Sequence, residues 1–210
     1  LRELRSAFAE HLNSFYETNL IDLNNIGITS GCNQAFGATI ATLAKAGDEI
    51  ILPTPWYFNH KMWLDIFDIK AIALASTPKL VPDIKLAQKS ITDKTKAIIL
   101  VSPNNPTGVE YPKKLISDFY KLCVQNEIQL IIDETYKDFN PTENAPHELF
   151  SLNGWSKNYT LLYSFSKVFH LTGHRVGAVV TSHDRLLEIE KYLDSSTICP
   201  SQIGQQAALY

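Results

Sequence analysis

The sequence has 210 residues, of which 45% are hydrophobic and 20% are charged, and its formal net charge is −3. This composition is typical of a globular protein with a sizeable buried core. The absence of a basic cluster argues against nucleic-acid and membrane-surface partners, and no apolar run approaches the ~20 residues of a transmembrane helix.

The predicted elements begin with an amphipathic helix over residues 1–16, followed by a short strand over 26–28. Apolar runs without polar alternation then predict strands buried on both faces, at 49–53, 70–75, 96–102, 128–134, 159–164 and 176–181. Between them, helices are predicted at 33–45, 56–67, 83–89, 112–126 and 183–194. This alternation predicts an α/β fold with a mostly parallel sheet and right-handed crossovers.

Neither a linker nor an internal repeat divides the chain, so residues 1–210 are predicted to form one unit. The sequence lacks an initiating Met and stops within a helical pattern, from which we expect an interior piece of a longer protein. Three scattered cysteines show neither metal-ligand spacing nor a disulfide framework, which favours a reducing, cytoplasmic setting.

Ligands of such sheets bind at the carboxyl ends of the strands, so functional residues are expected directly after each strand. After the first strand, Gly31 precedes a helix start at Cys32 and Asn33. Free backbone N–H groups there could bind an anion, although a plain helix start would look the same. Without a G-x-G-x-x-G or G-K-[ST] motif, a single phosphate is the simpler expectation.

After the strand at 49–53, Trp56 and Tyr57 could stack on a flat ligand or simply pack in the core. Periodicity does not decide which of these rings faces a site. After the strand at 96–102, Asn104 and Asn105 could both cap the turn of SPNNPTG, or Asn105 could donate to a ligand oxygen.

Asp133 ends a strongly apolar strand, where a buried, unpaired carboxylate would be costly. It is therefore an exposed strand end, a helix cap or the partner of a ligand cation, and Tyr136 could reach the same ligand. The last stretch, SFSKVFHLTGHR, places Lys167 after the hydroxyl of Ser164 and eight positions before Arg175.

Pyridoxal 5′-phosphate would use all of these groups. Its phosphate suits the helix-start amides and a cation, its aldehyde requires a lysine amine, and its ring nitrogen requires an acid. The predicted cofactor-binding residues are Gly31, Cys32, Asn33, Tyr57, Asn105, Asp133, Tyr136, Ser164, Lys167 and Arg175.

The motifs SGCNQAF, PTPWYFNH, SPNNPTG, DETY and SFSK followed by HRVG occur in an order that resembles the class I/II aminotransferases, which are fold-type I pyridoxal-phosphate enzymes. The resemblance covers nearly the whole chain. It implies a three-layer α/β sandwich with a mixed, mostly parallel sheet. Residues 1–210 would then be an incomplete large cofactor-binding domain, with the small domain outside this chain.

The resemblance also implies roles for single residues. Lys167 matches the Schiff-base lysine, Asp133 the partner of the ring nitrogen, and Tyr136 and Asn105 the donors to the ring oxygen. By this resemblance, Lys167, Asp133 and Tyr136 are the expected catalytic residues, and no metal is expected.

At the phosphate, the resemblance matches Ser164, Arg175 and the amides of Cys32 and Asn33 with ligands of that group. Tyr57 matches the stacking ring. In the family another ring usually follows it three positions later, where this chain has a histidine, and this departure leaves Trp56 possible. Cys32 and Asn33 also stand where small or hydroxyl residues are frequent, which puts only their side-chain contacts in doubt. Ser166 and His174 are expected to be a supporting hydroxyl and a bystander.

The implied activity is transfer of an amino group between an amino acid and a 2-oxo acid, by a homodimer whose partner completes each site. A substrate-binding arginine is expected in the part outside this chain. A pyridoxal-phosphate lyase or decarboxylase on the same fold remains an alternative, because fold and cofactor do not determine the reaction. A ligand-sensing domain of a transcription regulator is the non-enzymatic alternative.

Overall fold

The computed structural model describes residues 1–139 and 144–210. Its strands are β1 (Ile26–Thr29), β2 (Glu49–Thr54), β3 (Lys70–Ala75), β4 (Thr95–Val101), β5 (Gln129–Asp133), β6 (Tyr159–Ser164) and β7 (Gly177–Val180). Its α-helices are α1 (Arg2–Phe15), α2 (Cys32–Leu43), α3 (Phe58–Ile66), α4 (Ile84–Ser90), α5 (Lys113–Gln125), α6 (His183–Ser196) and α7 (Gln202–Leu209). Short 3-10 turns lie at η1 (Leu23–Asn25), η2 (Lys137–Phe139), η3 (Leu149–Ser151), η4 (Trp155–Lys157) and η5 (Thr172–His174).

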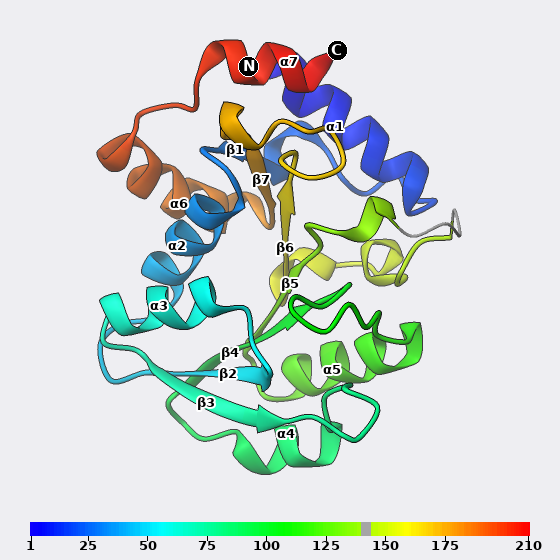
Figure 1. The fold of residues 1–210 in the computed structure, drawn as a ribbon, viewed down its shortest axis with the longest axis vertical. Helices are drawn as coiled ribbons and strands as arrows, with labels where there is room; N and C mark the ends of the chain where they lie inside the picture. Colours follow the sequence, from blue (N-terminus) through cyan, green and yellow to red (C-terminus); the bar gives the residue numbers. More distant parts are fainter. Residues whose placement is uncertain (140–143) are drawn as a thin grey trace.

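The strands of the described residues form one sheet in the order β1-β7-β6-β5-β4-β2-β3 (Figure 1). Neighbours from β6 through β5, β4 and β2 to β3 pair in parallel, and β7 is antiparallel to both of its neighbours. The mixed, mostly parallel sheet is confirmed. Because β7 runs the other way, its start lies at the same edge as the carboxyl ends of the other strands.

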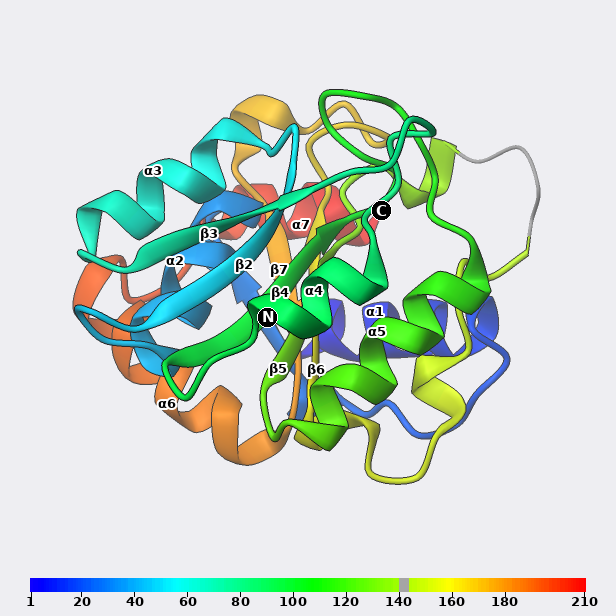
Figure 2. The same ribbon diagram turned by 90° about the horizontal axis from the view of Figure 1, so that it is seen from below.

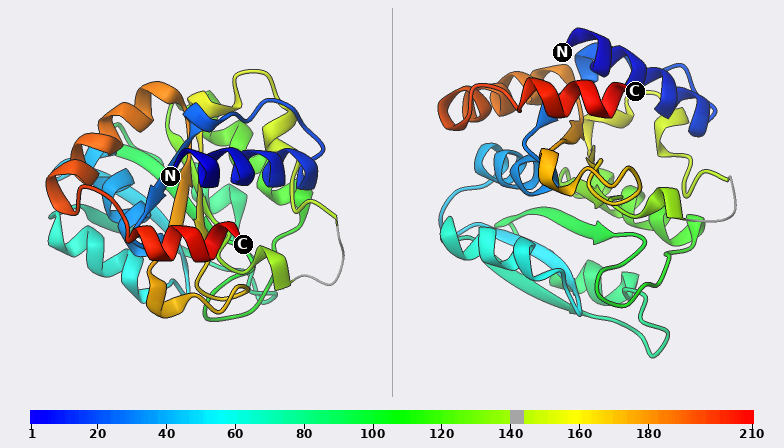
Figure 3. Two further views of the ribbon diagram at one scale, coloured as in Figure 1. Left: turned by 90° about the horizontal axis from the view of Figure 1, so that it is seen from above. Right: turned by 45° about the horizontal axis from the view of Figure 1, so that its top comes forward.

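Helices cover both faces of the sheet. Helices α2, α3 and α6 lie on one face, whereas α1, α4 and α5 lie on the other (Figure 2). Strand residues alternate between the two cores, with Ile98 and Leu100 on the α1 side and Ala97 and Ile99 on the α2 side. Helix α7 packs beside α1, and the two chain ends lie near this pair (Figure 3). The three-layer sandwich is confirmed.

One strand departs from the expected burial on both faces. In β3 only Leu74 is buried, whereas Lys70, Ala73 and Ala75 are exposed. The reason is position, because β3 is the edge strand and pairs with β2 alone. An apolar run predicts a strand, but it does not show whether that strand lies at the edge of the sheet.

Candidate functional site

A pocket of about 330 Å³ opens at the edge of the sheet where the carboxyl ends of β4, β5 and β6 meet the starts of α2 and α3. This volume falls within the range of small-molecule sites. Nine of the ten predicted cofactor-binding residues line it: Cys32, Asn33, Tyr57, Asn105, Asp133, Tyr136, Ser164, Lys167 and Arg175. The tenth, Gly31, is the N-cap of α2 directly beside it.

Asp133 forms one end of the pocket, and it is 3% exposed. Its Oδ1 accepts hydrogen bonds from the Thr135 amide at 3.0 Å and from the Thr135 hydroxyl at 2.7 Å. Its Oδ2 lies 3.2 Å from Nε2 of His60. Burial alone would raise the pKa of this carboxyl, but the hydrogen bond and charge of His60 and the bonds from Thr135 lower the pKa below its ordinary value. Asp133 therefore presents a buried anion to the pocket.

The position of His60 explains why Asp133 tolerates burial. His60 is itself buried, stacked on Phe36 at 4.1 Å between ring centroids and edge-on to Tyr57 at 5.2 Å. His60 is the histidine, three positions after Tyr57, that departs from the family pattern. Its ring joins the pocket's aromatic wall to the Asp133 carboxylate. Its place one helical turn after Tyr57 was the available signal, but its partner lies on another element.

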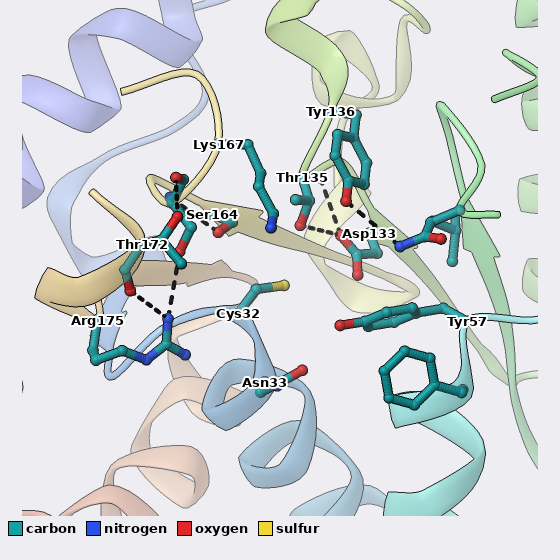
Figure 4. A pocket seen from close by; sticks show the side chains of 14 residues that line it. Cys32, Asn33, Tyr57, Asp133, Thr135, Tyr136, Ser164, Lys167, Thr172 and Arg175 are labelled. Atoms are coloured by element: carbon teal, nitrogen blue, oxygen red, sulfur yellow. Dashed lines mark hydrogen bonds between the residues drawn. The ribbon is translucent and has the colours of Figure 1, made fainter. Parts of the chain in front are cut away.

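Tyr136 lies above Asp133 in Figure 4, and Asn105 lines the same pocket. The Asn105 side-chain amide lies 3.5 Å from the Tyr136 hydroxyl, at the outer limit of a hydrogen bond. Asn104 is turned away and buried, where its Oδ1 accepts from the amide and hydroxyl of Thr107. The neighbouring asparagines thus divide the two roles that the sequence left open, since Asn104 caps the turn and Asn105 faces the pocket.

Tyr57, and not Trp56, forms the aromatic wall of this pocket. Trp56 packs instead against the core on the α2 side. The Asn59 amide donates to the Tyr57 hydroxyl and to Oδ1 of Asn33, both at 3.1 Å. Burial, followed by the charge of Asp133, raises the pKa of Tyr57. Tyr57 therefore stays a neutral phenol, with its ring face available for stacking.

The opposite end of the pocket is the first turn of α2. The backbone N–H groups of Cys32 and Asn33 lie there, where a helix has no internal acceptor for them, and the helix dipole is positive. Gly31 adopts φ +85°, and a Cβ atom on it would lie 2.2 Å from Nη2 of Arg175. Only glycine therefore lets the guanidinium approach the start of the helix.

Arg175 directly precedes Val176, and its side chain reaches this end of the pocket. Its backbone is left-handed, with φ 55°. Its guanidinium donates to the carbonyls of Thr172 at 3.1 Å and Ser30 at 3.4 Å, and lies 3.5 Å from the Ser166 hydroxyl. Ser166, expected only as a supporting hydroxyl, lines the pocket with Thr172, whereas His174 does not line it. Arg175 is exposed, so a ligand anion could reach it.

Lys167 projects between the two ends (Figure 4). It is exposed, and within residues 1–139 and 144–210 no hydrogen bond or ion pair engages its ammonium group. Ser164 lies deeper and is buried, and its hydroxyl accepts from the Ser166 amide at 3.2 Å. The amine of Lys167 thus has no polar partner among the residues that the structure describes.

Cys32 offers a second nucleophile to the same pocket, but its pKa argues against that use. Burial, followed by the charge of Asp133, raises the pKa of this thiol well above its ordinary value. A thiol that keeps its proton is a poor nucleophile. The raised pKa therefore counts against Cys32 as the nucleophile of this pocket.

Comparison with known proteins identifies the relatives of this chain. Over 99% of its length it is 30% identical to an aspartate aminotransferase of Pyrococcus abyssi and 28% identical to an aspartate/prephenate aminotransferase of Thermus thermophilus. It covers 54% and 53% of those proteins, so it spans about half the length of the curated relatives that it matches.

Solved structures agree with these relatives. The whole chain superimposes on an aspartate aminotransferase from Thermotoga maritima with a TM-score of 0.93 at 26% identity, covering 56% of that chain. An aromatic aminotransferase from Pyrococcus horikoshii gives a TM-score of 0.92 at 29% identity, again with 56% covered. The family model for aminotransferase class I and II matches residues 1–210, and the chain therefore belongs to that family.

Proposed function

We propose that the protein containing this chain is a pyridoxal-phosphate-dependent aminotransferase, which moves an amino group between an amino acid and a 2-oxo acid. The observation that carries the proposal is one pocket with three different chemical groups in it. These are the amine of Lys167, which no described residue pairs with, the buried anion of Asp133, and a cation beside the first amides of α2 at Arg175. Relatives named as aspartate and aromatic aminotransferases support the same reaction class.

The polar groups at the two ends of the pocket suit two different parts of pyridoxal phosphate. The amides of Cys32 and Asn33, with Arg175, suit a phosphate, and Gly31 leaves room for that cradle. Asp133 suits a protonated ring nitrogen at the other end. When bound, this cofactor supplies an aldehyde and an electron-withdrawing ring.

Each residue would then have a definite task. Lys167 would hold the cofactor through its Nζ atom and, as a free amine, would move a proton at the substrate Cα. Asp133 would keep the ring nitrogen protonated, while Tyr136 and Asn105 would donate to the ring oxygen. Tyr57 would hold the ring plane by stacking.

We further propose that residues 1–210 are most of the large domain, and that a small domain and a substrate-binding arginine lie in the remaining length seen in relatives. A homodimer completing each site belongs to the same proposal. All three cysteines are free thiols, which suits a reducing cytoplasm. None of the described helices is long and apolar enough to cross a membrane.

The test is borohydride reduction of the full-length protein saturated with pyridoxal phosphate. We expect a visible absorption band that reduction removes, with the pyridoxyl group found by mass spectrometry on Lys167 and absent from Lys167→Ala. A wild-type protein without this band would contradict the cofactor assignment. Product analysis then decides the reaction, because a lyase or decarboxylase would release its products from one substrate without requiring a 2-oxo acid acceptor.

A further inference from the structure

Beneath the pocket, on the opposite face of the sheet, lies a buried polar cluster of Tyr16, Glu134, His147 and Tyr159. Its position follows from the alternation of β5, in which Ile131 joins the α2-side core and Ile132 the α1-side core. Asp133 follows Ile131 by two residues, so its side chain is on the same face of the sheet and lies in the pocket. Glu134 contacts Tyr16 at the end of α1 instead, and it is 1% exposed.

The Glu134 carboxylate is held from two sides. Oε2 accepts from the Tyr16 hydroxyl, and Oε1 lies 2.9 Å from Nε2 of His147. Nδ1 of His147 accepts from the Leu149 amide, so Nε2 carries the proton, and it lies 2.9 Å from both Glu134 and the Tyr159 hydroxyl. Burial, followed by the charge of Glu134, raises the pKa of Tyr16, so the phenol keeps the proton that it donates.

A second anchor follows three residues later. Lys137 is buried, pairs with Asp138, and lies 4.0 Å above the ring of Phe15 at the end of α1. Asp138 also accepts from the hydroxyl of Tyr163 on β6. Both anchors therefore tie the segment after β5 to α1 and β6, on the side away from the pocket.

Tyr136 lies between these anchors. The Glu134 amide donates to Leu162 of β6 at 2.9 Å, and the Glu134 carbonyl accepts from the Lys137 amide at 3.1 Å. These bonds hold the backbone on both sides of Tyr136, whose own hydroxyl reaches Asn105 in the pocket. The Glu134 side chain and the Tyr136 phenol thus extend from one short, anchored segment, on opposite sides of it.

We propose that Glu134 is a positioning residue for Tyr136, with Tyr16 and His147 as the donors that fix its carboxylate. The inference rests on the proposed function, because it assigns Tyr136 the task of donating to the cofactor's ring oxygen. A ring oxygen with one donor fewer holds the neighbouring proton of the lysine–cofactor linkage more tightly. The pH at which the visible band of the bound cofactor changes is therefore the readout.

The experiment is a double-mutant cycle in the full-length, cofactor-loaded protein with Glu134→Gln, Tyr136→Phe and their combination. Gln keeps the size of the side chain but turns one acceptor into a donor that faces another donor. We expect Tyr136→Phe to raise the spectral midpoint, Glu134→Gln to raise it by less, and the combination to match Tyr136→Phe alone. Glu148→Gln, an exposed glutamate beside His147, is the matched control and leaves the midpoint unchanged.

Additive shifts, or an unchanged midpoint in Glu134→Gln with cofactor still bound, would overturn the inference and leave the proposed function intact. A wild-type protein that binds no cofactor would instead contradict the proposed function itself. If Glu134→Gln does not fold, Tyr16→Phe enters the same cycle, because it removes a donor to the carboxylate and leaves the carboxylate itself in place. A shift of Tyr16→Phe that persists in the Tyr136→Phe background would equally overturn the inference.

Discussion

Asp133 and Arg175 mark two ends of one pocket that are built in different ways. Asp133 ends a core strand, is buried, and is held by His60 and Thr135. Arg175 is exposed and is held mainly by carbonyls of loop residues. The Asp133 end, where we propose the cofactor ring, is thus part of the protein's core. The Arg175 end, where we propose the phosphate, is a surface cradle that glycine keeps open. We expect changes at the first to affect chemistry and stability, and changes at the second to affect cofactor affinity.

The largest expected effect is at the ring end. Asp133→Asn keeps the shape of the side chain but removes the anion that would hold a ring proton. We expect transamination by the full-length protein to fall by ~100-fold or more, about 2.7 kcal/mol in the barrier, while the cofactor stays bound through the other end. Turnover is measured with absorbance confirming cofactor occupancy. Near-normal turnover would show that the Asp133 carboxylate is not required for the chemistry, and would contradict the expected difference between the two ends.

Arg175→Ala tests the phosphate end. Loss of a charge-assisted hydrogen bond, typically about 1.5–3 kcal/mol, should weaken pyridoxal phosphate binding ~10- to 100-fold. Because Arg175 is exposed, the melting temperature of the apoprotein should hardly change. Titration with pyridoxal, which lacks the phosphate, provides the matched control. Equal losses of affinity for both compounds would show that Arg175 acts on the whole pocket.

His60→Phe sharpens the comparison by separating stability from chemistry. Phe preserves the stacking ring but leaves Oδ2 of Asp133 without its donor, which should cost about 1–3 kcal/mol of unfolding free energy. Because the pKa of Asp133 is lowered in the folded state, its contribution is full above the ordinary carboxyl pKa and is lost as the pH falls through the lowered value. Denaturant titrations should therefore show the largest difference from wild type near pH 7 and a shrinking one below about pH 4. A difference independent of pH would indicate lost packing only.

The smallest expected effect comes from Gly31→Ala, with Gly47→Ala as its matched control. Both glycines have positive φ, at +85° and +83°, so each substitution should cost about 1 kcal/mol of stability. Only at Gly31 would the new methyl group meet Arg175, since nothing lies within 4 Å at Gly47. We therefore expect similar melting temperatures but weaker pyridoxal phosphate binding in Gly31→Ala alone. Unchanged affinity in both variants would separate Gly31 from the phosphate end.

Much of the fold could be predicted from local sequence pattern. The run at 70–75 has the bounds of β3, and the helices at 112–126 and 183–194 match α5 and α6 to within two residues. The positions of Asp133, Ser164 and Lys167 at or after strand ends likewise followed from the runs before them. Hydrophobic period and turn chemistry are properties of neighbouring residues, so they can be read directly.

The tertiary structure decided the choices between neighbours. The chain alone left Asn104 against Asn105 and Trp56 against Tyr57 open, and it gave no sign that His60 meets Asp133. It also marked 70–75 as buried on both faces, although its place at the sheet edge leaves only Leu74 buried. Which side chain faces a pocket depends on strand order, register and turn geometry, and these arise from contacts between segments far apart in sequence. Local pattern therefore determined which elements form and what chemistry they carry, and packing determined which atoms meet.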